Sequence, residues 1–244
     1  MSEHVIITGH SRGLGAALAN AWLDLDATVF GVARHGNAAL KAAYPAHFQE
    51  MLADLADVDA LMHVARSNAF REFCRESKRL WLFNNAGTVQ PASVLGEQDA
   101  DAIVQAVHLN ILAPILLANA VVAAAGAKTQ VNIVHIGSGA AATAYPGWSI
   151  YGASKAALKQ HARVGLMENT QTRIVCIAPG VVDTAMQAEI RNDAGFPLRD
   201  RFQHLHDSGT LQDADDTAIK IVSYCLSHEF GQEAAVDVRQ ILGS

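Results

Sequence analysis

Tyr151 and Lys155, four residues apart, are the pair of side chains in this sequence best suited to acid–base chemistry. The segment from Tyr151 to about residue 169 is predicted to be helical, and residues four apart share a helix face. A free phenol has a pKa of about 10. A lysine cation about 4 Å away would contribute about 4 kcal/mol at an effective dielectric constant of about 20, roughly the cost of bringing that pKa to neutral pH. The spacing therefore predicts that Lys155 tunes Tyr151 as an acid.

Three glycines near the start of the chain predict an anion-binding loop. The run Val5–Thr8 predicts a strand, Gly9, Gly13 and Gly15 follow it, and helical spacing continues to about Leu25. Glycine allows sharp turns and close backbone approach, and the positive end of the following helix attracts anions. The spacing Gly-x3-Gly-x-Gly differs from the common dinucleotide fingerprint, so a glycine-rich turn without a ligand is the alternative. The ligand we expect is the pyrophosphate of a dinucleotide.

Two arginines indicate which dinucleotide the loop would prefer. The apolar run Ala27–Ala33 predicts a buried strand that completes a βαβ unit. NAD-binding proteins of this kind usually place Asp or Glu after that strand to bond the ribose 2′-hydroxyl. This sequence has Arg34 there and Arg12 in the glycine loop, and guanidinium groups bond phosphate well. We therefore expect NADP(H); the alternative is that both arginines are solvated surface residues.

The rest of the chain alternates predicted strands and helices. Further strands are expected at about 48–53, 80–83, 131–136, 172–178 and 234–238, and helices at about 58–77, 102–125, 151–169 and 213–227. The segment 181–209 has short helical pieces at best, and its length indicates a lid. This alternation predicts a single domain over residues 1–244, with a Rossmann-type doubly wound parallel sheet of about seven strands and helices on both faces.

Composition and charge exclude several classes of protein. Half of the 244 residues are hydrophobic and 17% are charged, which is typical of a folded α/β domain with a well-buried sheet. The net charge of −6 without a Lys/Arg run argues against a nucleic-acid partner. The longest apolar stretch, Ile111–Gly126, contains Pro114 and Asn119 and is shorter than a membrane span, so a buried helix is expected. Three widely spaced cysteines and no leader peptide predict a cytoplasmic protein, and no metal site is expected.

Together these motifs resemble those of the short-chain dehydrogenase/reductase family. They follow one another over nearly the whole chain, as Thr8-Gly-x3-Gly-x-Gly15, Asn84-Asn-Ala-Gly87, Asn110, Ser138, Tyr151-x3-Lys155 and Pro179-Gly180. The resemblance implies a nicotinamide cofactor, a small-molecule carbonyl substrate, and association into homodimers or homotetramers. It implies a catalytic set formed by Asn110, Ser138, Tyr151 and Lys155.

Each member of the implied catalytic set has a role. Hydride would pass to a substrate carbonyl carbon while Tyr151 delivers the proton. Ser138 would hold the carbonyl oxygen by hydrogen bonding as charge develops on it. Asn110 resembles the residue that positions a water between Lys155 and solvent, although an asparagine amid apolar neighbours could also be a structural hydrogen-bonding group.

The resemblance also implies the cofactor contacts. Thr184 resembles the position that bonds the nicotinamide carboxamide, and Asp54-Leu55 resembles the pair beside the adenine. The expected contacts are Gly9, Ser11, Arg12, Gly13, Leu14, Gly15, Arg34, Asp54, Leu55, Asn85, Ala86, Gly87, Tyr151, Lys155, Pro179, Gly180, Val182 and Thr184.

Runs outside the shared motifs are similar to the benzil reductase and sepiapterin reductase branch. These runs are 85–89, 180–187, 190–191 and 209–211. The implied activity is reduction of a ketone or vicinal diketone, either benzil-like or a pterin with a dicarbonyl side chain. The expected substrate wall comprises Ser138, Tyr145, Trp148, Tyr151, Met186 and Asp237. Asp237 resembles an aspartate that anchors a pterin ring; ordinary packing under a lid and a solvated Asp237 are the alternatives.

Other functions are compatible with parts of this pattern. A short-chain alcohol dehydrogenase of another substrate class would share every motif named above. An inactive NADP-binding regulator would usually have lost the tyrosine or the lysine. A methyltransferase also begins with a strand, a glycine loop and a helix, but it has no use for Tyr151 with Lys155.

Overall fold

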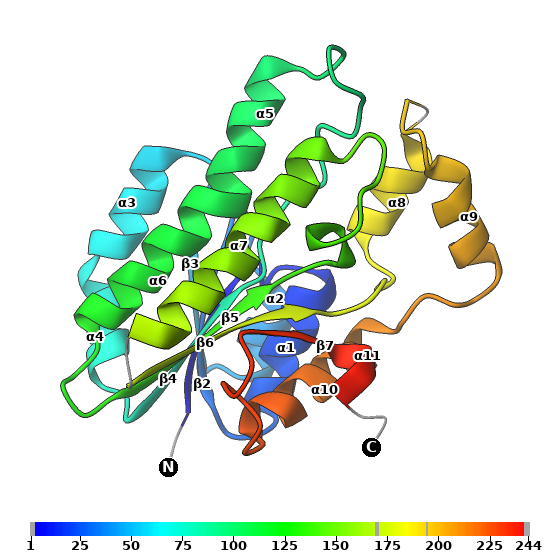
Figure 1. Cartoon of the computed structure of the whole chain (residues 1–244). Helices are drawn as coiled ribbons and strands as arrows, with labels where there is room; N and C mark the ends of the chain where they lie inside the picture. The colour runs from blue at the N-terminus through cyan, green and yellow to red at the C-terminus, as the bar shows by residue number, and fades with distance from the viewer. Residues whose placement is uncertain (1–2, 169–170, 194, 242–244) are drawn as a thin grey trace.

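The computed structural model describes residues 3–168, 171–193 and 195–241. A seven-stranded sheet runs through its centre in the order β3-β2-β1-β4-β5-β6-β7, and every pairing is parallel (Figure 1). The strands are β1 His4–Thr8, β2 Thr28–Ala33, β3 Phe48–Leu52, β4 Arg79–Asn84, β5 Gln130–Ile136, β6 Thr172–Ala178 and β7 Ala235–Asp237. The chain winds outward from β1 in both directions, which is the Rossmann-type doubly wound topology predicted from the sequence.

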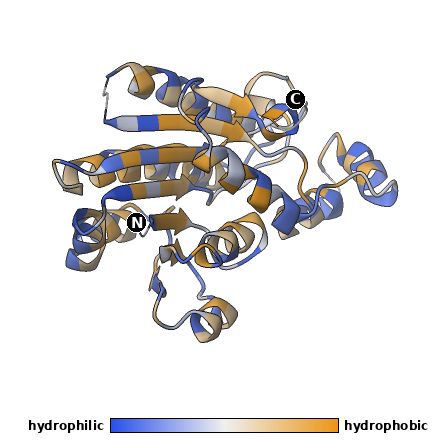
Figure 2. Cartoon of the chain, turned by 90° about the horizontal axis from the view of Figure 1, so that it is seen from below, coloured by the Kyte–Doolittle hydropathy of each residue, from blue (hydrophilic) through white to orange (hydrophobic). Residues whose placement is uncertain are grey.

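The sheet is buried on both faces because successive strand residues point to opposite sides. In β1, Val5 and Ile7 pack into one apolar layer, and Ile6 packs into the other. Figure 2 shows hydrophobic residues along the central strands and on the helix surfaces that cover them. A parallel sheet needs such cover, and it explains why the strands contain continuous apolar runs.

Helices cover the sheet in two layers (Figure 1). One layer contains α1 Gly13–Leu23, α2 Ala38–Ala43 and α10 Ala214–Leu226, and it packs around the tryptophans Trp22 and Trp81. The other contains α3 Val58–Arg66, α4 Asn68–Arg75, α6 Ala113–Ala124 and α7 Ser149–Glu168. The short helix α11 Val238–Ile241 follows β7.

Three helical segments differ from the sequence prediction. The helix expected at 58–77 is two helices, because Ser67 adopts extended backbone and its hydroxyl accepts a 3.3 Å hydrogen bond from the Phe70 amide, which caps α4. Helix α2 is absent from the sequence prediction, because it is too short to show a clear helical period. Asn37 nevertheless caps its N-terminus. The helix expected at 102–125 begins as α5 Ala100–Val107 and passes through a π-helical turn, His108–Leu112, before α6.

The stretch Ala100–Ala124 is long and apolar enough to meet the simple criteria for a membrane span. A core helix meets the same criteria, and α6 packs against α3, α4, β4 and β5. Its residues Leu117 and Val121 are fully buried in that layer. The helix is thus a core element of this fold.

The segment predicted to be a lid forms two helices beyond the carboxyl edge of the sheet. Helices α8 Ala185–Asn192 and α9 Arg199–Asp207 contact each other and project away from the sheet (Figure 1). Phe202 of α9 packs on Trp148, which precedes α7, and Ile190 of α8 belongs to the same apolar cluster. The exposed side of α9, farthest right in Figure 2, is largely hydrophilic. The lid therefore encloses a third apolar cluster, separate from the two layers that cover the sheet.

Candidate active site

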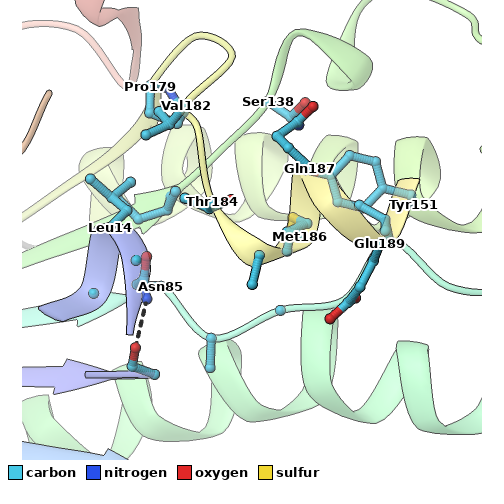
Figure 3. A pocket seen from close by; sticks show the side chains of 18 of the residues that line it. Leu14, Asn85, Ser138, Tyr151, Pro179, Val182, Thr184, Met186, Gln187 and Glu189 are labelled. Atoms are coloured by element: carbon cyan, nitrogen blue, oxygen red, sulfur yellow. Dashed lines mark hydrogen bonds between the residues drawn. The ribbon is translucent and has the colours of Figure 1, made fainter. Parts of the chain in front are cut away.

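A cavity of about 440 Å³ lies at the carboxyl ends of the parallel strands. Its walls come from the glycine loop after β1, the loops after β2 to β6, the first turns of α7, and the lid. Figure 3 shows Leu14 and Asn85 on one side and Ser138 and Tyr151 on the other, with the segment from Pro179 to Glu189 between them. Ligands of open parallel sheets bind at this edge.

The glycine loop is shaped so that only glycine fits at its critical positions. Gly9 and Gly13 have φ values of +73° and +54°. A Cβ atom on Gly15 would lie 2.1 Å from the Gly9 carbonyl oxygen, so α1 can begin this close to the strand only without a side chain there. Helix α1 carries no acidic residue in its first turn. Its N-terminal amides and the loop can therefore receive a pyrophosphate.

Thr8 and Asn85 join the ends of β1 and β4 beneath this loop. The Thr8 hydroxyl accepts hydrogen bonds of 3.0 Å from the amides of Asn85 and Ala86. The Asn85 side-chain amide donates to the Thr8 carbonyl at 3.0 Å and to the Gly9 carbonyl at 3.4 Å, the second of which is drawn in Figure 3. Asn85, Ala86 and Gly87 all line the cavity, as the sequence predicts for cofactor contacts. Asn85 in addition fixes the loop, which the motif alone does not reveal.

Arg34 and Arg12 both line the cavity, on the side where a 2′-phosphate is expected. Arg34 is exposed, and its neighbour His35, which sequence reasoning did not select, lines the cavity as well. The guanidinium of Arg12 lies 3.5 Å from the Glu189 carboxylate, and both side chains are largely exposed, so this pair is weak. The remaining predicted cofactor contacts, from Asp54 to Thr184, also line the cavity.

Tyr151 and Ser138 bring two hydroxyl groups together in the cavity wall. Ser138 follows β5, Tyr151 lies in the first turn of α7, and both side chains line the cavity. Burial raises the pKa of Tyr151 above its ordinary value, and the nearby Ser138 hydroxyl partly offsets this effect. Tyr151 is therefore a protonated phenol at neutral pH.

Lys155 lies beside the Tyr151 ring, but its hydrogen bond goes to another element. Its Nζ donates a 2.8 Å hydrogen bond to the Ile136 carbonyl and lies 5.6 Å from the centre of the Tyr151 ring. Burial lowers the pKa of Lys155 itself to about 8. The pKa of Tyr151 is raised and not lowered as the sequence predicts, because burial of the phenol is the largest influence on it.

Asn110 lies in the π-helical turn and is buried. Its side-chain oxygen accepts from the Thr88 amide at 2.9 Å, and its Nδ2 donates to the Thr88 carbonyl at 2.8 Å. Asn110 is not part of the cavity wall. However, a Cβ atom on Gly87 would lie 3.1 Å from the Asn110 Oδ1 and 3.7 Å from the Lys155 Nζ, so Gly87 keeps open a space that both groups face.

The expected substrate wall is largely assembled. Tyr145, Trp148 and Met186 line the cavity with Tyr151 and Ser138. The ring centres of Trp148 and Tyr151 are 5.1 Å apart, and those of Tyr145 and Trp148 are 5.6 Å apart. The wall also contains residues that sequence reasoning missed: Gln187, Ile190, Arg201, Phe202, Leu205 and Arg239. Only the helical period within the lid could have indicated the apolar members of this group.

Asp237 does not reach the cavity as expected. Its two carboxylate oxygens bond the Arg239 guanidinium, and its Oδ1 also accepts from the Arg239 amide at 3.0 Å. Arg239 lines the cavity instead. Arg239 follows Asp237 by two residues and pairs with its carboxylate. In this part of the wall the arginine of that ion pair therefore faces the cavity, where a free carboxylate is expected from the sequence.

No group of three or more His, Cys, Asp or Glu side chains suited to a metal ion occurs in residues 3–168, 171–193 and 195–241. The polar groups of the cavity are mainly hydroxyls, amides and cations, with the carboxylates of Asp54 and Glu189. They suit an anionic cofactor and a carbonyl group.

The fold and this cavity define a dinucleotide-binding protein of the Rossmann type, and comparison with known proteins specifies its family. The family profile described as short chain dehydrogenase matches residues 3–195. The protein therefore belongs to the short-chain dehydrogenase/reductase family, whose members are oxidoreductases that use nicotinamide cofactors.

Individual relatives match nearly the whole chain. A benzil reductase ((S)-benzoin forming) of Bacillus cereus is 32% identical, with 97% of this chain and 99% of that protein covered. A sepiapterin reductase of Rattus norvegicus is 31% identical, covering 97% and 96%. The crystal structure of a short-chain dehydrogenase/reductase from Burkholderia vietnamiensis is 38% identical, with a TM-score of 0.72 and 98% of each chain covered. The similarity to this branch agrees with the sequence prediction, and it supports carbonyl reduction.

Proposed function

We propose that this protein is an NADP(H)-dependent carbonyl reductase that acts on a ketone or a vicinal diketone. The observation that carries the proposal is that the side chains of Tyr151 and Ser138 line the same cavity as the glycine loop. The paired hydroxyls can bind a carbonyl oxygen, and the loop can hold a pyrophosphate. One cavity can thus hold both the carbonyl substrate and the dinucleotide.

The cofactor is held from the glycine loop to the lid. Gly9, Gly13 and Gly15 receive its pyrophosphate, Arg12 and Arg34 its 2′-phosphate, and the remaining predicted contacts line the path toward Tyr151. The absence of an acidic side chain directly after β2, where Arg34 and His35 stand, supports NADP(H) over NAD(H). When bound, the nicotinamide supplies the hydride.

Tyr151 supplies the proton. Because burial raises the pKa of Tyr151, the phenol is protonated at neutral pH, which is the form required to donate to a carbonyl oxygen during reduction. Ser138 is placed to donate a hydrogen bond to the same oxygen as negative charge develops on it. The Lys155 cation, 5.6 Å from the ring centre, then stabilises the phenolate that remains.

Asn110 positions groups around the catalytic set. Its Nδ2 lies 3.3 Å from the Ser154 hydroxyl, and that hydroxyl donates at 2.7 Å to the Tyr151 carbonyl, so Asn110 supports the first turn of α7. With Lys155 it also faces the space beside Gly87, which can admit a water and return a proton to the site.

The substrate end favours a flat and mostly apolar carbonyl compound. The rings of Tyr145 and Trp148, with Met186 and Phe202 from the lid, provide the wall beside Tyr151. Benzil-like diketones fit this wall, and the names of the similar reductases support them. A pterin with a dicarbonyl side chain is the second candidate, supported by the similarity to sepiapterin reductases.

Oxidation of NADPH, followed at 340 nm with a panel of diketones, tests the proposal. We expect turnover of benzil and related vicinal diketones, and weaker turnover when NADH replaces NADPH. If the protein binds NADPH but reduces none of the carbonyl compounds, it is an inactive cofactor-binding protein instead. Turnover of simple alcohols or sugars alone would indicate another substrate class of the family.

Two further properties extend the proposal. We expect homodimers or homotetramers, in line with family membership, and sedimentation of the purified protein measures this. We also expect a cytoplasmic location, which is supported by three buried cysteines that are free thiols. Fractionation of cells that express the protein at its natural level tests the location.

A further inference from the structure

Two arginines reach the substrate end of the cavity beside Tyr145. Arg201 of α9 places its guanidinium carbon 5.3 Å from the centre of the Tyr145 ring. Arg239 lines the same cavity, and its pKa is raised, first by the hydrogen bond to Asp237 and in smaller part by Tyr145. Arg201 therefore contacts an aromatic residue of the substrate wall, and Arg239 lines the same cavity.

The charges of these two arginines are not equally balanced. Arg239 is paired with Asp237, with its Nε 2.9 Å from the carboxylate. In the part of the chain that the structure describes, Arg201 makes no ion pair. The acidic residues of the cavity wall do not compensate it, because Glu189 contacts Arg12 and Asp54 follows β3 in the region expected for adenine. A protein with a net charge of −6 thus presents an unbalanced cation at this end of its cavity.

A row of aromatic rings leads from the reacting phenol to this cation. Tyr151, Trp148, Tyr145 and the Arg201 guanidinium follow one another at separations of 5.1, 5.6 and 5.3 Å. A ligand whose carbonyl group contacts Tyr151 would lay an apolar portion along these rings. Its far end would then meet Arg201.

We propose that the preferred substrate is an aromatic ketone or diketone that carries a carboxylate beyond its apolar portion, and that Arg201 binds this carboxylate. This inference rests on the proposed carbonyl reductase function and specifies its substrate class. The planar guanidinium bonds a carboxylate with two parallel hydrogen bonds, and the Tyr145 ring supports it through a cation–π contact. Arg239, already oriented by Asp237, offers a second group of donors.

The same geometry argues against a pterin. A pterin ring would present N–H donors, and the carboxylate expected to accept them, Asp237, is bonded to Arg239. The guanidinium groups of Arg201 and Arg239, which line the cavity here, are donors themselves. An anionic acceptor on the substrate therefore matches them better.

A matched set of three substrates tests the inference: benzil, 4-carboxybenzil, and the methyl ester of 4-carboxybenzil. The ester has nearly the size of the acid without its charge. We expect kcat/KM for the acid to exceed that for the ester at least tenfold, mostly through KM, and the ratio to decrease as salt is added. Arg201→Gln should reduce the acid-to-ester ratio at least tenfold, and Arg201→Lys should restore part of it.

The control variant is Arg163→Gln, which removes the same charge from the exposed side of α7, away from the cavity. It should leave the acid-to-ester ratio within twofold of the wild type. An acid-to-ester ratio near one in the wild-type protein, or a ratio that Arg201→Gln does not change, would overturn the inference.

Binding measured by calorimetry in the presence of NADP+ separates this inference from the proposed function. If no diketone is turned over but 4-carboxybenzil binds at least tenfold more tightly than its ester, and Arg201→Gln removes this difference, the carboxylate site is present and the reductase function is wrong. If the wild type and Arg201→Gln reduce all three compounds and bind them with equal affinity, the reductase function is supported and the carboxylate site is wrong.

Discussion

The Nε2 atom of His135 lies 3.0 Å from the Nδ1 atom of His161, so a fully buried imidazole on β5 is bonded to a partly exposed one on α7. On the neighbouring strand β4, the Asn84 side-chain nitrogen lies 3.2 Å from His135 Nδ1, and it also donates to the Pro114 carbonyl. An amide nitrogen only donates, so His135 accepts at Nδ1 and carries its proton on Nε2. This arrangement requires neutral His135, and burial, with smaller effects of His161 and Lys155, lowers its pKa to about 3.

The histidine pair should make the protein less stable in acid. Between about pH 6.5 and pH 3 the unfolded chain binds a proton at His135 that the folded protein does not, so the free energy of unfolding falls as pH decreases. The slope is at most about 1.4 kcal/mol per pH unit for one proton. In His135→Gln, the loss of stability from pH 7 to pH 4.5, measured by urea unfolding, should be smaller than in the wild type by about 2 kcal/mol. The exposed control His228→Gln should lose as much as the wild type.

Tyr151→Phe should abolish turnover without affecting cofactor binding. Phenylalanine keeps the ring that packs on Trp148 and removes only the proton donor. We expect kcat to fall at least about 100-fold, the usual contribution of a positioned acid, while the Kd of NADPH, measured by fluorescence, changes less than threefold. A variant that retains a tenth of the activity would show that another group delivers the proton.

Lys155→Ala should damage both catalysis and cofactor binding. Lys155 is buried between the end of β5 and Tyr151, and the family resemblance assigns it a bond to the nicotinamide ribose in addition to its effect on Tyr151. We expect a lower kcat together with weaker NADPH binding. Unchanged NADPH affinity in this variant would contradict the second role.

The rate of carbonyl reduction should decrease above about pH 8. Burial lowers the pKa of Lys155 to about 8, so its cation is lost as pH rises through that value. The phenolate formed on Tyr151 would then lack its neighbouring charge. The raised pKa of Tyr151 cannot produce this decrease, because that group titrates above its ordinary value of 10. Saturating rates measured from pH 6 to pH 10 test this, and Lys155→Arg should move the decrease to higher pH.

Cofactor preference should depend on Arg34. We expect a higher kcat/KM with NADPH than with NADH, and we expect Arg34→Asp to reverse this order, because a carboxylate repels the 2′-phosphate and bonds a 2′-hydroxyl. The control Arg163→Asp makes the same charge change away from the cavity. Arg12→Gln should have a smaller effect than Arg34→Asp, since Arg12 already contacts Glu189. A preference for NADPH that survives Arg34→Asp would mean that the arginine is only a surface residue.

The parts of this protein that the sequence predicts are those in which the local residue pattern and the overall fold require the same secondary structure. Continuous apolar runs such as Leu80–Phe83 indicate strands buried on both faces, so the order of the elements follows from the pattern. The glycines after β1 and the pair Tyr151 and Lys155 are likewise local, because their spacing alone places them at the strand edge and on one helix face.

The missed features depend on contacts between distant segments. Nothing in α9 indicates that Arg201 lies over Tyr145, and whether Asp237 or its neighbour Arg239 faces the cavity depends on where the end of β7 lies relative to the lid. The position of Lys155 follows from its bond to Ile136, a residue on another element. Such relations arise only when the lid, the end of β7 and α7 are brought together.

The close approach of α1 to β1 should make Gly15 the least replaceable residue of the glycine loop. In Gly15→Ala the new Cβ would lie 2.1 Å from the Gly9 carbonyl oxygen and 2.5 Å from the Asn85 side-chain amide, so the start of α1 must move. We expect a loss of stability of about 1 to 3 kcal/mol, typical of overpacking, and at least tenfold weaker NADPH binding. Gly139→Ala is the control for stability, since its Cβ would meet no atom within 4 Å, and its melting temperature should stay within a degree or two of the wild type. Because the displaced amides are those proposed to hold the pyrophosphate, adenosine 2′,5′-bisphosphate, which lacks one, should lose less affinity for Gly15→Ala than NADPH does. Equal losses for both ligands would indicate that the loop is disrupted as a whole and does not contact the pyrophosphate selectively.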